Sequence, residues 1–155
     1  MGWWPCGGCG AAACAHCTSG TTPDQVSIAI SGFTSPFGCT NCGTIDRTIV
    51  ATRSTSPSYP CSWSTSIFSI NHGPGLACGY IGYHLILDIK TVPLSSNIGW
   101  VLELWGGIYL HILETWSWNS GGTSAFDCSI ARTLTHNTTV TYPCSTSSNA
   151  TITPL

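Results

Sequence analysis

Cysteine is the residue type with the clearest chemical potential in this chain, which has 10 of them among 155 residues. A thiolate binds zinc or forms a disulfide, so the spacing of the cysteines has to be examined for both chemistries. Some of them form C-x-x-C pairs and the others stand singly. The pairs are Cys6/Cys9, Cys14/Cys17 and Cys39/Cys42, and the single residues are Cys61, Cys78, Cys128 and Cys144.

Two of the C-x-x-C pairs have the form of a zinc knuckle, because glycine follows their second cysteine. The tight turn in such a knuckle points backbone amides at the sulfur atoms, and two knuckles complete a tetrahedral site of four thiolates. That site has no open coordination position, so its zinc ion would be structural and not catalytic. The candidate ligands are Cys6, Cys9, Cys39 and Cys42, with Cys14 and Cys17 as alternates.

The alternative is an all-disulfide framework, which the even number of cysteines favours. Cys61 and Cys78 bracket a strand and a turn, and Cys128 and Cys144 bracket a second unit of this kind. Each would close a loop of about 15 residues, which stabilises a fold by about 3 kcal/mol in the chain-entropy model. We therefore expect disulfides at the four single cysteines, while zinc and disulfides are open alternatives at the C-x-x-C pairs.

Acid–base groups are sparse and form no recognisable catalytic set. The chain has 6 acidic residues and 5 histidines, and it has no nucleophile-elbow, zinc-protease or phosphate-loop motif. His84 and Asp88 would share a strand face about 13 Å apart, too far for a dyad. His84 and His111 would meet across adjacent strands as a satisfied structural pair. The sequence therefore predicts no catalytic residue, and we expect a protein that is not an enzyme.

Tryptophan is the other side chain with binding potential. Most of the 7 tryptophans lie in apolar runs and are expected in the core. Trp3, Trp4 and Trp118 lie in or beside irregular segments, where an exposed ring anchors a protein interface or stacks on a sugar. The adjacent rings of Trp3 and Trp4 favour an interface anchor, because a terminal arm can reach onto a neighbouring subunit.

The segments that must position these groups have the pattern of short strands. The densest apolar stretch, residues 79–118, holds three apolar runs separated by PLSSN and by Gly106-Gly107, and residues 26–31 have a branched side chain at every second position. The pattern predicts an all-β fold, an antiparallel β-sandwich or jelly roll, over residues 24–155, preceded by a cysteine-rich N-terminal arm over residues 1–23. The expected core is Val26, Ile28, Ile30, Trp63, Ile67, Leu85, Leu87, Trp100, Leu102, Leu104 and Ile112.

Charge is scarce, because charged residues make up 6% of the chain against roughly 25% in ordinary soluble domains. A net charge of -2 gives no electrostatic footprint for nucleic acid, and 4 basic residues cannot form a polybasic membrane patch. No apolar run approaches the ~20 residues of a membrane helix, and the first residues lack a signal-peptide pattern. We expect no nucleic-acid or membrane partner, and a virion or extracellular location.

Several segments are similar to motifs of a known group. The chain has PDQVSIAISGF at residues 23–33, CTNCGTIDRTIVATR at residues 39–53, Cys61-Ser62-Trp63 and a terminal ATITP. In these segments, about half of the chain at most, it resembles small cysteine-rich β proteins found in phage and in some environmental bacterial genomes. The resemblance carries no catalytic residue and implies a virion or surface component.

These observations lead to two expectations from different classes. The first is a structural, assembly-forming protein, a phage virion component such as a head-decoration, tail or fibre subunit, whose partners are further copies or other virion proteins. The second is a secreted or surface carbohydrate-binding module that uses exposed tryptophans to bind a glycan. The expected cofactor is none, or one structural zinc ion.

Overall fold

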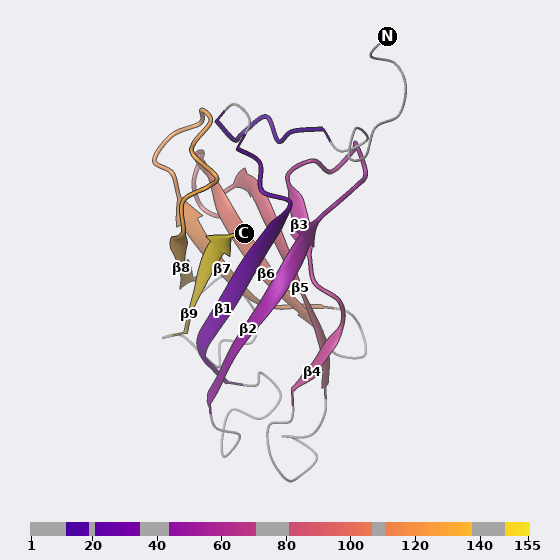
Figure 1. The fold of residues 1–155 in the computed structure, drawn as a ribbon. Helices are drawn as coiled ribbons and strands as arrows, with labels where there is room; N and C mark the ends of the chain where they lie inside the picture. Colours follow the sequence, from indigo (N-terminus) through magenta and orange to yellow (C-terminus); the bar gives the residue numbers. More distant parts are fainter. Residues whose placement is uncertain (1–11, 19–20, 35–43, 71–80, 107–110, 138–147) are drawn as a thin grey trace.

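The computed structural model describes residues 12–18, 21–34, 44–70, 81–106, 111–137 and 148–155 (Figure 1). These residues form nine β-strands and contain no helix. The strands are β1 (Gln25–Thr34), β2 (Thr44–Arg53), β3 (Ser62–Ser64), β4 (Phe68–Ile70), β5 (Ile81–Thr91), β6 (Ile98–Gly106), β7 (His111–Asn119), β8 (Arg132–His136) and β9 (Asn149–Pro154).

The strands close into a barrel. The order in the sheet is β3-β2-β1-β9-β8-β7-β6-β5-β4, and β3 also pairs with β5, which joins the two sides of the sheet. The short strands β3 and β4 pair with successive parts of β5, as one interrupted strand. All of these pairings are antiparallel. The described chain is therefore a closed 8-strand barrel with up-and-down connections, β9 pairing back onto β1.

The predicted antiparallel all-β fold is confirmed for the described residues, but the predicted sandwich and jelly roll are wrong. A sandwich would leave two separate sheets with open edges, whereas here β1 pairs with β9 over six residue pairs and β3 pairs with β5. Both architectures alternate inward and outward side chains along each strand, so residue periodicity does not separate them.

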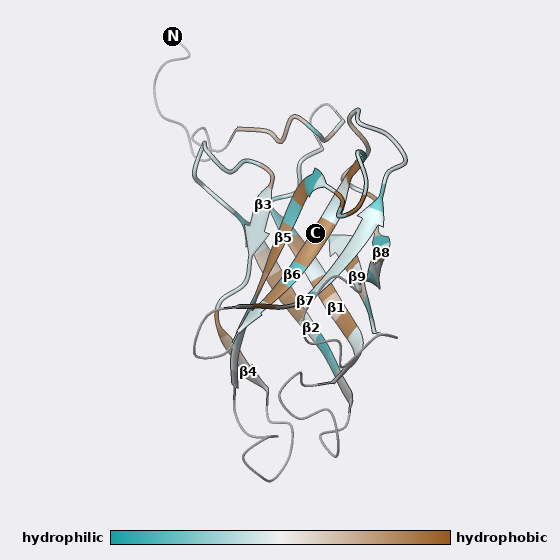
Figure 2. Cartoon of the chain, turned by 180° about the vertical axis from the view of Figure 1, so that it is seen from behind, coloured by the Kyte–Doolittle hydropathy of each residue, from teal (hydrophilic) through white to brown (hydrophobic). Residues whose placement is uncertain are grey.

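Inward-facing residues fill the barrel. Every second residue of β5 from Tyr83 to Ile89 is buried, and Figure 2 shows apolar bands along β1, β5 and β6. The rings of Trp63 and Trp100 lie 5.1 Å apart inside the barrel. The largest completely buried side chains are Trp63, Trp100, Trp116, Tyr83, Ile28, Leu85, Leu87, Leu102, Leu104 and Leu134.

The expected core is corrected at Ile67, whose side chain is 75% exposed. Ile67 lies in the short break between β3 and β4, where the alternation of the interrupted strand is lost. The neighbouring Phe68 restores it, because Phe68 pairs with the buried Tyr83 and packs against the core. Ile112 is half-buried.

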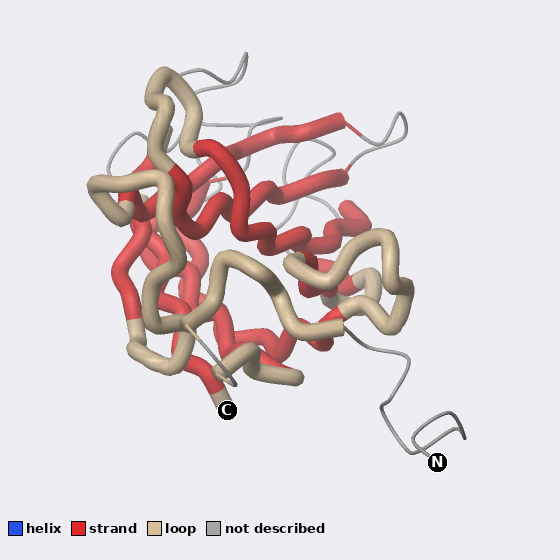
Figure 3. The backbone as a smooth tube through the Cα atoms, turned by 90° about the horizontal axis from the view of Figure 1, so that it is seen from above, coloured by secondary structure: helices blue, strands red, loops and turns tan. Residues whose placement is uncertain are grey.

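The two ends of the barrel differ. Residues 12–18 and 21–23 and the connections 54–61, 92–97 and 120–131 lie at one end, which we call the capped end, and Figure 3 looks onto it. The last residues of β1, β4, β6 and β8 and the first residues of β2, β5, β7 and β9 lie at the opposite end. An eight-stranded barrel has an interior just wide enough for side chains to fill. Other segments of the chain can therefore contact the interior side chains only at the two ends of the barrel.

Glycine is required at position 99, where β6 and β7 approach closely. A Cβ atom there would lie 1.8 Å from the carbonyl oxygen of Trp118, which is backbone and cannot rotate away. We expect Gly99→Ala to lower the free energy of unfolding by about 3 kcal/mol, the upper part of the overpacking range, in urea unfolding experiments. Gly82→Ala is the matched control, because its Cβ would meet only Ile67 Cγ2 at 3.5 Å. Equal stability of the two variants would contradict the close approach.

Candidate functional site

Two disulfides attach the N-terminal arm to the capped end. Cys14 pairs with Cys61, 47 residues away, and Cys17 pairs with Cys128, 111 residues away. All the cysteines of the described chain are in these two bonds. The arm is thereby connected to two different loops, the β2–β3 connection and the β7–β8 connection.

These pairings correct the predicted ones. Cys61 does not pair with Cys78, and Cys128 does not pair with Cys144, because the arm supplies both partners. Cys78 and Cys144 lie outside the described residues. The short loops expected from nearest-neighbour pairing are replaced by long ones, because the connections that meet at one end of a barrel are distant in sequence.

Neither the zinc-site hypothesis nor the nearest-neighbour disulfide hypothesis predicted the role of the C-x-x-C pair at Cys14 and Cys17. A turn closed by the Cys17 N–H donating to the Cys14 carbonyl, 3.0 Å, lets the two sulfur atoms reach separate loops. Both sulfur atoms are in disulfides, so their assignment as alternate zinc ligands is wrong for this structure.

The principal zinc candidates, Cys6, Cys9, Cys39 and Cys42, lie outside the described residues, and a zinc site there stays a prediction. Within the described ranges, no cluster of three or more His, Cys, Asp or Glu side chains is placed to hold a metal ion.

Backbone hydrogen bonds integrate the arm with the barrel. The Thr18 N–H donates to the Phe126 carbonyl, and the Phe126 N–H donates to the His16 carbonyl, both at 2.9 Å. The indole N–H of the buried Trp63 donates to the Pro23 carbonyl at 2.8 Å. Arg53 donates to the carbonyl of Ala12 at 2.7 Å. Residues 12–18 and 21–23 are therefore part of the folded barrel and close its interior at this end.

Aromatic side chains fill the interior beneath this cap. Trp118, predicted to be a candidate interface ring, is half-buried on the inward side of β7, where it pairs across the sheet with Trp100. Its ring lies 5.1 Å from the Phe126 ring, and the Arg132 guanidinium lies over it at 4.1 Å. Trp118 thus serves the packing of the cap and offers no open platform. Trp3 and Trp4 lie outside the described residues.

The β7–β8 connection, residues 120–131, is called the cap loop below. Asp127 shapes it, because the Asp127 carboxylate accepts hydrogen bonds from Ser129. These hydrogen bonds hold the pKa of Asp127 below its ordinary value. The bond from the Ser129 hydroxyl has the larger effect and the bond from the Ser129 amide the smaller one. A carboxylate with a lowered pKa contributes stability above its ordinary pKa and loses it as the pH falls through the lowered one. The Asp127 turn places Cys128 next to the arm.

A buried ionisable pair joins β7 and β8 on the other half of the barrel. The Glu114 and His136 side chains are 0% and 1% exposed, and His136 Nε2 is hydrogen-bonded to a Glu114 carboxylate oxygen. The ring of Trp116, which pairs with His136 across the two strands, lies edge-on to the imidazole. The Trp116 indole N–H donates to the buried Ser148 hydroxyl at 3.0 Å.

No sequence pattern predicts this pair. Glu114 and His136 are 22 residues apart, and no short motif links them. The available signal was an acidic residue two positions before Trp116, which places it on the same face of the strand. The carboxylate orients the imidazole, but within the described residues no side chain is hydrogen-bonded to His136 Nδ1. The pair alone is an orienting element, and the expectation that the protein is not an enzyme stays a prediction.

The predicted contact between His84 and His111 is wrong, because β6 lies between β5 and β7. The His84 ring instead stacks on Trp105, with the ring centroids 6.2 Å apart and the planes at 19°.

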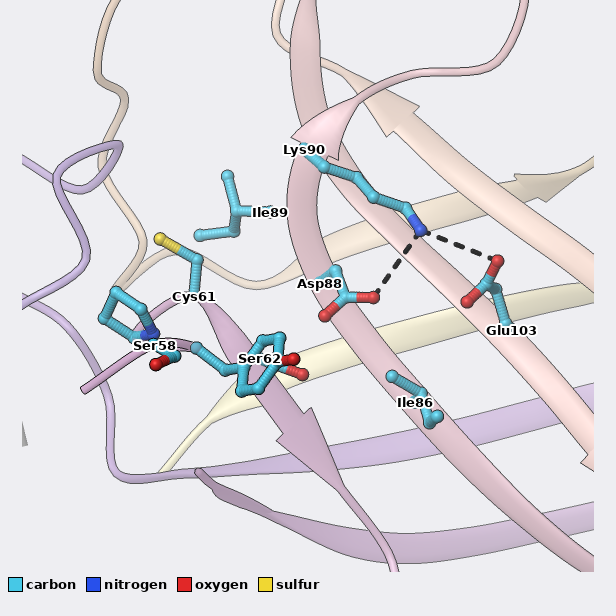
Figure 4. A pocket seen from close by; sticks show the side chains of 10 residues that line it. Ser58, Cys61, Ser62, Ile86, Asp88, Ile89, Lys90 and Glu103 are labelled. Carbon is cyan, nitrogen blue, oxygen red and sulfur yellow. Dashed lines mark ion pairs between the residues drawn. The ribbon is translucent and has the colours of Figure 1, made fainter. Parts of the chain in front are cut away.

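A hollow of about 460 Å³ lies on the outer wall, between the β2–β3 connection and strands β5 and β6 (Figure 4). Lys90 Nζ lies 3.6 Å from a carboxylate oxygen of Asp88 and 3.6 Å from one of Glu103. Tyr59, 65% exposed, stands at the edge. We call this site the Tyr59 hollow; its lining is Ser58, Tyr59, Pro60, Cys61, Ser62, Ile86, Asp88, Ile89, Lys90 and Glu103.

The disulfides indicate an oxidising, non-cytoplasmic location. In the described part of the chain, no helix has the length and apolar character to cross a membrane. Comparisons with protein-family models, with curated proteins and with solved structures find no match to this chain.

Proposed function

We propose that the protein is a structural, assembly-forming subunit of a phage virion, a head-decoration, tail or fibre component. The observation that carries the proposal is the placement of exposed apolar side chains. Leu94, Ile130 and Leu155 are 94%, 45% and 66% exposed, and all three belong to segments at the capped end. We call them the capped-end apolar set. Apolar side chains gathered at one end of a barrel favour contact with another subunit.

Leu94 is presented in an unusual backbone conformation. Its φ is 61°, in the left-handed region, which costs a side chain with a Cβ atom about 1–2 kcal/mol. The loop around it is held by the Val92 N–H donating to Asn97 and the Ser95 N–H donating to Val92, at 2.9 and 3.1 Å. The strained backbone holds the leucine side chain in solvent. A role of Leu94 in contact with another subunit would explain why this strain is retained.

The cap itself supports the same proposal. The first described residue of the N-terminal segment, Ala12, lies at the capped end, which also carries the apolar set. Disulfides make this end resistant to opening outside the cell. A chain with 6% charged residues gives contacts that depend little on salt, as suits a particle exposed to changing media.

We expect the combined variant Leu94→Ser, Ile130→Ser and Leu155→Ser to remain folded but to shift the protein from assemblies to monomers. Sedimentation velocity and negative-stain electron microscopy measure the change. The matched control is Val50→Ser with Ile67→Ser, which removes apolar side chains 45% and 75% exposed on the barrel wall. The proposal fails if both variants assemble like the unmodified chain, or if the unmodified chain is monomeric at all concentrations.

Carbohydrate binding is the second candidate function. The expected platform, Trp118, is half-buried against Phe126 and does not support it. The observation that favours a glycan is the Tyr59 hollow, where an exposed aromatic ring stands beside polar side chains.

A further inference from the structure

We infer that the Tyr59 hollow binds a neutral polyhydroxyl ligand, a sugar of one or two rings. Charged side chains are concentrated at this hollow. The chain has only 4 basic and 6 acidic residues, yet Asp88, Lys90 and Glu103 all line this one hollow. Three of the ten acidic and basic residues of the chain therefore line a single site.

The three charged groups are arranged so that they suit a neutral ligand. Lys90 Nζ lies between the Asp88 and Glu103 carboxylates at 3.6 Å from each, so the position that a cationic ligand would take is already filled (Figure 4). The carboxylates repel an anion. Both carboxylates are half-buried, at 21% and 14% exposure, and each keeps acceptor capacity that the single ammonium does not use. Hydroxyl groups, which donate and accept, match this set without adding charge.

The hollow also has an apolar part. Tyr59, Pro60 and Ile86 all line it and offer apolar surface to the C–H face of a sugar. Ser58 and Ser62, which carry hydroxyl groups, belong to the same lining. A volume of about 460 Å³ falls within the range of roughly 300–1,000 Å³ that small-molecule sites occupy.

The wall that carries Tyr59 is fixed in place, as a preformed site requires. Cys61 is bonded to Cys14, and its carbonyl accepts from the Ile89 N–H at 3.0 Å. The Tyr59 N–H donates to the Ser56 carbonyl at 3.1 Å, which closes the turn before the ring. The Cys14–Cys61 disulfide and the hydrogen bond from Ile89 therefore fix one side of the hollow next to β5.

The test is binding of neutral disaccharides to the full chain. We would titrate cellobiose, maltose, lactose and N,N′-diacetylchitobiose separately and follow binding by saturation-transfer NMR and calorimetry. At least one is expected to bind, and Tyr59→Ala is expected to weaken it about tenfold. Glu103→Gln is expected to weaken it less, because the amide keeps one acceptor. Ile67→Ala, which also removes an exposed apolar side chain, is the control and should bind as the unmodified chain does.

Two results would overturn the inference. One is the absence of binding for all four disaccharides at millimolar concentration, and the other is a Tyr59→Ala variant that binds as well as the control. Tighter binding of tetramethylammonium or glucuronate than of any neutral sugar would contradict the charge argument. The titration is repeated on the Leu94→Ser, Ile130→Ser, Leu155→Ser variant, so that loss of assembly and loss of sugar binding are observed separately.

Discussion

The variant Cys17→Ala with Cys128→Ala is expected to lose about 5 kcal/mol of unfolding free energy and about 10–20 °C in melting temperature. The reason is the length of the loop that this disulfide closes, 111 residues, because the entropy removed from the unfolded chain grows with loop length. Differential scanning calorimetry without reductant measures the change. The arm should also lose amide-exchange protection at Thr18 and Phe126, whose N–H groups bond the arm to the cap loop.

The matched variant is Cys14→Ala with Cys61→Ala. This bond closes a loop of 47 residues, and the same chain-entropy model gives about 4 kcal/mol. The order of the two losses therefore tests the mechanism as well as the bond. A Cys17/Cys128 variant that melts within two or three degrees of the unmodified chain would show that the cap adds little to stability.

The second large effect is expected at the β7–β8 seam, where His136→Ala should cost about 3–5 kcal/mol. In the described chain the β7–β8 ladder has two residue pairs, Trp116 with His136 and Ser117 with Thr135, so the hydrogen bond between the Glu114 and His136 side chains carries a large share of the attachment. Removing the imidazole takes this partner from a completely buried carboxylate at Glu114. Urea unfolding measures the loss, and hydrogen exchange should show β8 opening before its neighbours.

Two further variants separate the effect of the Glu114–His136 hydrogen bond from that of general packing. His84→Ala removes a histidine from the half-buried outer face, where it stacks on Trp105, and should cost about 1 kcal/mol or less. In a double-mutant cycle, Glu114→Leu with His136→Leu should cost less than the sum of the single variants. Additive costs would mean that the two groups do not stabilise each other.

The strand content of this chain could be predicted from its residues, and the closure of the barrel could not. Alternation at Val26, Ile28 and Ile30 reports that one face of a strand is buried, which holds in a sandwich and in a barrel alike. Closure depends on the pairing of β1 with β9 and of β3 with β5. No local pattern records which edges meet, because that depends on how far the whole sheet twists and curls.

The same limit applies to the candidate sites. Cysteine spacing indicated the right chemistry for Cys61 and Cys128, but their partners depend on which loops share an end of the barrel. The Tyr59 hollow combines the β2–β3 connection with two strands that follow later in the chain, so no motif marks it. Single polar residues at inward positions, such as Glu114, are the signal in the sequence that identifies a buried pair.

The pairing of β9 with β1 has a consequence during synthesis. Every other pairing joins strands that follow closely along the chain, so it can form soon after the strands leave the ribosome. β1 must wait until β9 is made, and meanwhile one side of its backbone, from Val26 to Ser31, has no strand beside it. Unpaired edges of this kind recruit other chains, so misassembly of this protein should be greatest in the interval before closure and fall once the ring is complete.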